Sequence, residues 1–344
     1  MFFVGLGPGE RLMMRIAIVG CGALGSYYGA CLWRQGHETH FVLRSDHDVV
    51  RTEGVRILSP RGDFTARPHA VRRSEEVGPV DLVVIGLKST ANDQFHSLLP
   101  PLVGPGTAVL TLQNGLGNEE SLAELFPADQ ILGGLCFVCL NRIRPGVVTH
   151  LAHGRISMGQ FRRPPDDRTH RIAGLFREAG IDCSVSDNLE RARWEKLVWN
   201  IPFNGLGVAG CLGDLPSRTL SGAGDASLGN CLSTDQLLAH PEWRSWVGGL
   251  MDEVRSVAMA LGFPIPKEFA DTLVERTHEM GAYRPSTVVD FESGRSLELE
   301  RLFGEPLRRA RRVGVPTPHL EALTAVLSRL ASRQGRSTDR VVAQ

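Results

Sequence analysis

Short apolar runs separated by segments with helical periodicity form the first third of the chain. The apolar runs lie at residues 15–20, 38–44, 80–88 and 107–115. A helical pattern from Ala23 to about Gln35 follows the first run, and Gly36 can end it. Runs of Val, Ile and Leu without alternation are typical of parallel strands buried on both faces. We therefore predict an α/β fold whose N-terminal domain is a doubly wound Rossmann sheet.

The pattern changes in the second half of the chain. Two strand-like pieces, VVTHLA and RISMGQ, and a helix around 167–179 are expected to complete the sheet. Beyond Asn188 the helical period dominates, in segments near residues 189–209, 241–261, 266–280 and 296–313. The sequence therefore predicts an all-helical C-terminal domain.

These patterns divide the chain into a Rossmann domain, expected at 14–187, and a helical domain, expected at 188–335. Residues 1–13 are expected to be a disordered extension, and residues 336–344 a tail. The stretch 213–230 is rich in Gly, Ser and Asp and lacks periodicity. We interpret it as a loop insertion in the helical domain.

Composition narrows the classes of function. The 38 basic and 38 acidic residues balance and no dense basic cluster occurs, which argues against a nucleic-acid partner. No apolar run approaches the roughly 20 residues that cross a bilayer, and the N-terminus does not look like a secretion signal. We therefore expect a cytoplasmic protein with a small-molecule partner and no membrane association.

Seven cysteines, an odd number in a long chain, fit reduced thiols better than a disulfide framework. Cys136 and Cys139 form a C-x-x-C pair, and His150 and His153 follow. Their spacing differs from that of zinc fingers, and the cysteines lie in the apolar run GLCFVCL. We favour core or surface residues over a zinc site and expect no metal.

A glycine motif connects the first predicted strand to the first helix. Gly20, Gly22 and Gly25 spell G-x-G-x-x-G, which permits a tight turn, close approach of a pyrophosphate to the backbone and close helix packing. The helix N-terminus attracts the phosphate charge. We therefore predict that the residues of this turn bind a dinucleotide: Gly20, Cys21, Gly22, Ala23, Leu24 and Gly25.

The end of the second predicted strand bears on which dinucleotide binds. NAD-binding proteins usually place an acidic residue there, against the ribose 2′-hydroxyl. Arg44 stands at this place and would bind a 2′-phosphate, so NADPH (NADP) is favoured over NADH. The alternative is an ordinary exposed arginine, and Asp46 nearby is compatible with NADH.

Polar residues follow two further predicted strands. Lys88 ends one of them, and Gln113 and Asn114 end the other. Ligands bind at the carboxyl ends of strands in open α/β sheets, so we expect these side chains to line the nicotinamide and the reacting carbonyl. The alternative for QNG is a common turn.

A polar stripe lies on an otherwise apolar predicted helix at 190–206. Lys196, Asn200 and Asn204 share one face of it. Only three of the 38 basic residues are lysines, so a retained lysine is a candidate for a place that needs a titratable amine, with chance retention on the surface as the alternative. Partial desolvation lowers the pKa of such an amine toward the range of a proton donor. A solvated stripe is the alternative, and Pro202 is expected to kink the helix.

Together these motifs resemble the ketopantoate reductases (2-dehydropantoate 2-reductases), from about Arg15 to the end of the chain. The similar segments are GCGALG, the lysine after LVVIGL, QNG, WEKLVWNIPFNGL, RPSTVVDFESGRSLELE and LRRARRVGVPTP. The resemblance implies a C-terminal domain like that of 6-phosphogluconate dehydrogenase. It also implies NADPH-dependent reduction of ketopantoate to pantoate, a step of pantothenate and coenzyme A biosynthesis.

The resemblance assigns roles to individual residues. Lys196 would be the general acid that protonates the carbonyl oxygen as hydride arrives. Glu298 would be the glutamate near the start of the late helix, catalytic and close to the cofactor, and Ser286 would contact the substrate. Lys88 would lie near the cofactor. The asparagines that would hold substrate or lysine are Asn114, which also lies near the cofactor, Asn200 and Asn204.

Two departures from the family bear on the substrate. A familiar asparagine–glycine pair reads Phe303 and Gly304 here, and the 213–230 insertion would lie near the acid pocket. Other 2-oxo acids and a β-hydroxyacid dehydrogenase activity therefore remain alternatives, although the spacing of Ser286 and Glu298 favours the reductase. A non-catalytic NADPH-binding redox sensor is the alternative from another class, and a homodimer remains open.

Overall fold

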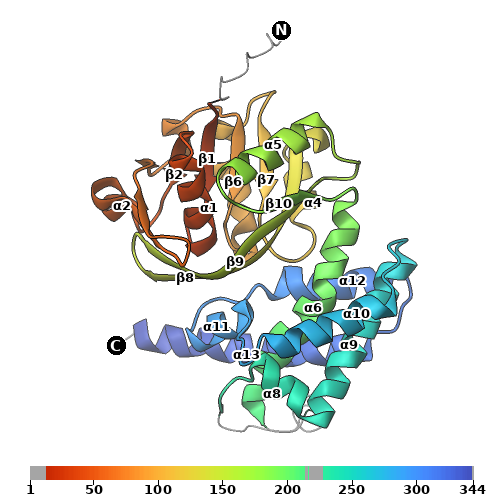
Figure 1. Ribbon diagram of the computed structural model, residues 1–344. Coiled ribbons are helices and arrows are strands. Elements are labelled where there is room, and N and C mark those ends of the chain that lie inside the picture. The colour runs from red at the N-terminus through yellow and green to blue at the C-terminus, as the bar shows by residue number, and fades with distance from the viewer. Residues whose placement is uncertain (1–12, 214–215, 217–227, 343–344) are drawn as a thin grey trace. The chain divides into compact units, whose positions relative to one another are not determined.

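The computed structural model describes residues 13–213, 216 and 228–342 and divides into two compact units (Figure 1). Unit 1 comprises the residues up to Gln113 and Glu119–Asp187, and unit 2 comprises Asn114–Asn118 and the residues from Asn188 onward. Residues 1–12 of the expected extension and most of the expected insertion lie outside the described residues. A five-residue loop from the first half of the chain thus belongs to the C-terminal unit.

Unit 1 is built on one mixed sheet. Its strands are β1 (Arg15–Val19), β2 (Glu38–Val42), β3 (Val55–Leu58), β4 (Phe64–Ala66), β5 (His69–Val71), β6 (Leu82–Ile85), β7 (Ala108–Thr111), β8 (Ile131–Arg144), β9 (Val147–Gln160) and β10 (Cys183–Val185). They are ordered β4-β3-β9-β8-β7-β6-β1-β2-β5, and β10 pairs with β9. From β5 to β8 all neighbours are parallel, in the strand order of a Rossmann sheet. The predicted fold class is confirmed.

Helices cover both faces of the parallel strands. They are α1 (Ala23–Arg34), α2 (His47–Glu53), η1 (Ser74–Glu76), η2 (Ser89–Gln94), α3 (Phe95–Leu98), η3 (Pro100–Leu102), α4 (Asn118–Ala123), η4 (Ala128–Gln130) and α5 (Asp167–Glu178). Successive strand residues point to opposite faces, so Ile16 and Ile18 of β1 pack in one cluster, with side chains of α1 and α5. Ala17 and Val19 pack in a second cluster, with Phe95 of α3. Every position of β6 and β7 is buried, which explains why these strands show no alternation.

The two strand-like pieces expected after residue 146 form one long strand, β9, which pairs with β8. His153 and Gly154 have positive φ angles of 66° and 119°, and the register shifts opposite them between Phe137 and Val138. A bulge therefore carries the pairing across the polar centre of the strand. The interpretation of two short strands is wrong. The bulge residues His153 and Gly154 are of the polar and glycine types that also end strands, so the sequence did not distinguish the two cases.

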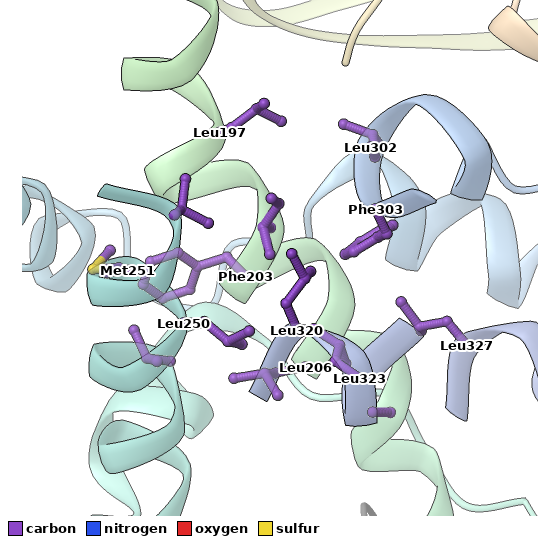
Figure 2. Close-up of a cluster of buried hydrophobic side chains, with 14 of the residues drawn as sticks. Leu197, Phe203, Leu206, Leu250, Met251, Leu302, Phe303, Leu320, Leu323 and Leu327 are labelled. Atoms are coloured by element: carbon purple, nitrogen blue, oxygen red, sulfur yellow. The ribbon is translucent and has the colours of Figure 1, made fainter. Parts of the chain in front are cut away.

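Unit 2 is helical. Its elements are α6 (Leu189–Ala209), η5 (Gly210–Leu212), α8 (Thr234–Ala239), α9 (Pro241–Ala260), α10 (Lys267–Glu279), α11 (Ser286–Glu292), the π-helical turn η6 (Glu300–Gly304), α12 (Glu305–Arg312) and α13 (Pro318–Val342). Leu197, Phe203 and Leu206 of α6 pack in one cluster with Leu250 of α9 and Leu323 of α13 (Figure 2). The predicted all-helical C-terminal fold is confirmed.

The central helix α6 begins at Asn188, whose side chain accepts a hydrogen bond of 2.9 Å from the Arg191 amide. It continues through Pro202 to Ala209. A Cβ at Gly205 would lie 2.6 Å from a methyl group of Leu323, so this glycine allows α13 to pack closely. The second half of α6 is buried on all sides, which explains why no hydrophobic stripe distinguishes it.

Three α-helices of unit 2 were not expected from the sequence. The helices α8 and α11 span only six and seven residues, too few for their period to be recognised. In contrast, α13 carries a clear signal, because Pro318 opens it and Leu320, Leu323, Leu327 and Leu330 are buried on one face.

Candidate functional site

The glycine turn of unit 1 requires residues without a side chain at two positions. Gly20 has a φ of +94°, and a Cβ there would lie 2.2 Å from the backbone nitrogen of Leu87. A Cβ at Gly25 would lie 2.3 Å from the Gly20 carbonyl oxygen. These clashes involve backbone atoms, so only glycine brings β1, α1 and the end of β6 together in this way.

Gly22 stands at the N-cap of α1 for a different reason. No side chain caps this helix, and a Cβ at Gly22 would meet nothing within 4 Å. The first-turn amides of α1 therefore have no capping side chain as acceptor, and a helix N-terminus of this kind can bind an anion. The turn fits the pyrophosphate of a dinucleotide.

Arg44 and Asp46 follow β2 and differ in their surroundings. Arg44 is exposed and makes no hydrogen bond or ion pair to a described residue. Asp46 is buried. It accepts two hydrogen bonds of 2.9 and 2.8 Å from the Arg142 guanidinium and another from the Gly146 amide. The aspartate is thus engaged in holding the start of α2 to the β8–β9 turn, whereas the arginine is available to a ligand.

Two of the predicted polar residues lie after β6 and β7. Lys88 is half-buried at the N-cap of η2. Gln113 is buried, and its amide nitrogen donates a hydrogen bond of 2.7 Å to Asn92 while Thr111 donates to its amide oxygen. Gln113 therefore orders the end of β7.

Asn114, the next residue, belongs to unit 2 and contacts the lysine of α6. The Lys196 ammonium donates a hydrogen bond of 2.9 Å to the amide oxygen of Asn114. Lys196 is half-buried, and Leu197 and Val198 beside it are fully buried. The amine of Lys196 is thus held in a partly apolar environment by an acceptor that lies 82 residues away in the chain.

Asn200, one helical turn beyond Lys196, is 8% exposed. Its side chain makes no hydrogen bond to any residue that the structure describes. The amide is not one of the fully buried side-chain groups that lack a partner, so it reaches accessible surface, where a ligand or water can bind it.

Asn204, a further turn along, is 3% exposed and uses both ends of its amide within the protein. Its side-chain nitrogen donates a hydrogen bond of 2.9 Å to the Asn200 carbonyl, and its side-chain oxygen accepts one of 3.0 Å from the Thr287 amide. Pro285 at the N-cap of α11 offers no side-chain cap, so Asn204 supplies one from α6. It thereby fixes the position of Ser286, which is exposed at the start of α11.

Glu298 lies just before the π-helical turn η6. Its carbonyl accepts a hydrogen bond of 3.2 Å from the Leu302 amide, and the residue is half-buried. Phe303, at a departure from the family pattern, is fully buried in the core, where its ring lies against Gly205. This departure is therefore a change of packing inside unit 2.

The cysteine–histidine group lies on the β8–β9 ribbon. His150 is 2% exposed, and its ring interacts with the Ser59 hydroxyl at 2.9 Å and the His153 carbonyl at 3.1 Å. Among the described residues no group of three or more His, Cys, Asp or Glu side chains could hold a metal ion. Nor does any helix in that part of the chain have the length and hydropathy needed to cross a membrane.

Comparison with known proteins gives matches over most of the chain. The family model for ketopantoate reductase PanE/ApbA matches residues 16–163. The model for the C-terminal part of ketopantoate reductase PanE/ApbA matches residues 225–331. Together these models match a large part of each unit.

Individual relatives agree with the family models. A 2-dehydropantoate 2-reductase of Nostoc is 39% identical over 325 residues, which are 93% of this chain and 96% of the relative. The crystal structure of 2-dehydropantoate 2-reductase from Geobacter metallireducens is 45% identical, with a TM-score of 0.83 over 92% of this chain and 99% of the other. The crystal structure of 2-dehydropantoate 2-reductase from Methylococcus capsulatus is 35% identical, with a TM-score of 0.81 over 93% of this chain and 97% of the other.

Proposed function

Since the chain belongs to the ketopantoate reductase family, we propose that it reduces ketopantoate to pantoate with NADPH and that Lys196 is the general acid. Family membership makes it a dinucleotide-dependent oxidoreductase that acts on CH–OH groups. The proposal adds the substrate, the choice of reductant and the roles of individual residues.

The hydrogen bond from Lys196 to Asn114 is the observation on which the proposal depends. The amide oxygen of Asn114 can only accept, so it orients the lysine as a donor. A general acid must present its proton to the carbonyl oxygen in a fixed direction, and a half-buried amine held in this way is suited to that role. Pantothenate and coenzyme A biosynthesis would be the pathway that uses the product.

The neighbouring polar residues are proposed to bind the 2-oxo acid. The amide of Asn200 lies one turn from Lys196, reaches accessible surface and makes no hydrogen bond to a described residue, which supports a contact with a substrate oxygen. Ser286 presents an exposed hydroxyl at the start of α11. Glu298 is proposed to orient Lys196 or to bind a substrate hydroxyl, and Asn204 to support Asn200 and Ser286.

The glycine turn and Arg44 are proposed to hold NADPH. The reduced nicotinamide would supply a hydride to the 2-oxo carbon. The electron pair of the carbonyl bond moves to its oxygen, which takes the proton from Lys196, so the ketone becomes a secondary alcohol. Arg44 is exposed and can pair with a 2′-phosphate. Asp46, the acidic residue that would favour NADH, is paired with Arg142. Lys88 is proposed to lie near the cofactor.

Loss of NADPH absorbance with the purified chain tests the proposal. Ketopantoate should be reduced with the highest kcat/KM among a panel that includes ketopantoate without its hydroxyl group and a phenyl-bearing 2-oxo acid. NADH should be a poorer reductant. Binding of NADPH without turnover of any 2-oxo acid would contradict the proposal, and faster turnover of another 2-oxo acid would correct the substrate.

A further inference from the structure

The loop Asn114–Asn118, which carries the acceptor of Lys196, is attached to Arg301 of η6 by two hydrogen bonds. The Leu116 amide donates a hydrogen bond of 2.9 Å to the Arg301 carbonyl, and the Arg301 guanidinium donates one of 3.0 Å to the Gly117 carbonyl. Arg301 therefore contacts the loop with its backbone and with its side chain.

A π-helical turn makes the Arg301 carbonyl available. In an α-helix this carbonyl would accept from the Glu305 amide, but that amide donates to the Glu300 carbonyl. The next residue, Pro306, has no N–H to donate. The helix thus contains no donor for the Arg301 carbonyl in either register, and the Leu116 amide supplies one from the loop.

The loop fits this turn closely. Gly115 has a φ of +84°, and a Cβ there would lie 2.3 Å from the Arg301 carbonyl oxygen. Leu116 is 2% exposed and packs in the core of unit 2. Asn118 closes the loop, because its side-chain nitrogen donates a hydrogen bond of 2.9 Å to the Asn114 carbonyl. Asn114 is therefore held between Asn118 and the residues that bind Arg301.

We propose that Arg301 is a positioning residue for catalysis, which acts through the loop to hold the Asn114 amide against the Lys196 ammonium. The inference rests on the proposed function of Lys196 as the general acid. The sequence contained one signal for it, because a proline inside a helical pattern such as 296–313 indicates a local change in hydrogen bonding.

Substitution of Arg301 and Asn114, alone and together, tests the inference. The variants are Arg301→Met, Arg301→Lys, Asn114→Ala and the double variant Asn114→Ala/Arg301→Met. Arg312→Met is the matched control, since Arg312 lies in the adjacent helix α12, is exposed and makes no hydrogen bond or ion pair to a described residue. Steady-state kinetics are measured with NADPH and ketopantoate.

Arg301→Met should lower kcat roughly tenfold or more, because a small displacement of a catalytic group is costly to the reaction. The KM for NADPH should change less than kcat, since Arg301 is proposed to act on the proton donor and not on the glycine turn that binds the pyrophosphate. Arg301→Lys should recover part of kcat because it retains a donor for the Gly117 carbonyl. In the Asn114→Ala background, Arg301→Met should lower kcat by less than about twofold further.

Hydrogen exchange provides a readout that does not require turnover. The Leu116 amide should exchange faster in Arg301→Met than in the wild type and the control. Multiplicative effects of Asn114→Ala and Arg301→Met on kcat, or unchanged kcat in folded Arg301→Met, would overturn the inference while leaving the proposed function intact. A wild-type chain that reduces no 2-oxo acid would overturn the proposed function, and the catalytic role of Arg301 with it.

Discussion

Lys196, Asn200 and Asn204 share one face of α6 but differ in how their polar groups are used. Lys196 donates to Asn114, and Asn204 is engaged at both ends of its amide. Asn200 makes no side-chain hydrogen bond to a described residue. Helical spacing predicted the shared face. It could not predict which amide is satisfied, because the partners of Lys196 and Asn204 come from segments that are 82 and 83 residues away.

Lys196→Ala should lower kcat for 2-oxo acid reduction by about a hundredfold or more, because positioned general acids typically contribute 10² to 10⁴ in rate. The KM for NADPH should stay within about threefold of the wild type. Lys267→Ala is the matched control, since Lys267 is an exposed lysine in the first turn of α10. A loss of less than about tenfold for Lys196→Ala would show that another group donates the proton.

Arg44→Ala should raise the KM for NADPH by about tenfold to a hundredfold, because a charge-assisted hydrogen bond contributes about 1.5–3 kcal/mol. The KM for NADH, which has no 2′-phosphate, should change little. Arg51→Ala provides the control, since Arg51 is also exposed and lies in the helix that follows. Equal effects on both cofactors would show that Arg44 does not contact the 2′-phosphate.

At the scale of elements, the sequence predicted those that bury a regular pattern and failed where the pattern was short or interrupted. The helices α1, α5, α6, α9 and α10 lie within one or two residues of their expected bounds. The strand β9 was divided in two because a bulge at His153 and Gly154 resembles a turn. The short helix α11 depends on a cap from Asn204, which local sequence does not contain.

Asn204→Ala should lower the free energy of unfolding by about 2 kcal/mol, because it leaves the Thr287 amide without its acceptor in a buried place. Asn188→Ala, which removes an exposed cap at the start of α6, should cost about 1 kcal/mol. Urea denaturation measures both. Wild-type stability of Asn204→Ala together with a large loss of kcat would instead mean that this amide serves the substrate directly.

At the scale of the whole molecule, periodicity and motif spacing predicted both fold classes because these signals are local. The assignment of Asn114–Asn118 to unit 2 could not be predicted in this way. It depends on the π-helical turn η6, which leaves the Arg301 carbonyl free to accept from the Leu116 amide. Arg301 lies some 185 residues beyond Leu116 in the chain. The sequence therefore indicated a set of candidate residues, whereas the interactions that position them, such as that of Lys196 with Asn114, could not be predicted from it.

Stability should fall as the pH drops below about 6.5, the ordinary pKa of histidine. Burial lowers the pKa of His150, and this effect outweighs the opposite effect of the hydrogen bond to the His153 carbonyl. As the pH decreases, the unfolded chain takes up this proton before the folded chain does. The unfolded state then binds more protons, so the free energy of unfolding decreases until the pH reaches the lowered pKa of folded His150.

Urea denaturation between pH 8 and pH 5 measures this dependence. His150→Gln cannot take up the proton, so it should make the decrease below pH 6.5 shallower, even if loss of the contacts with Ser59 and Tyr27 lowers stability at every pH. Part of the slope should remain, because burial also lowers the pKa of His40. His278→Gln, which replaces an exposed histidine in α10, should retain the slope of the wild type. An equal slope in all three chains would show that His150 takes up its proton at the same pH in the folded and unfolded states.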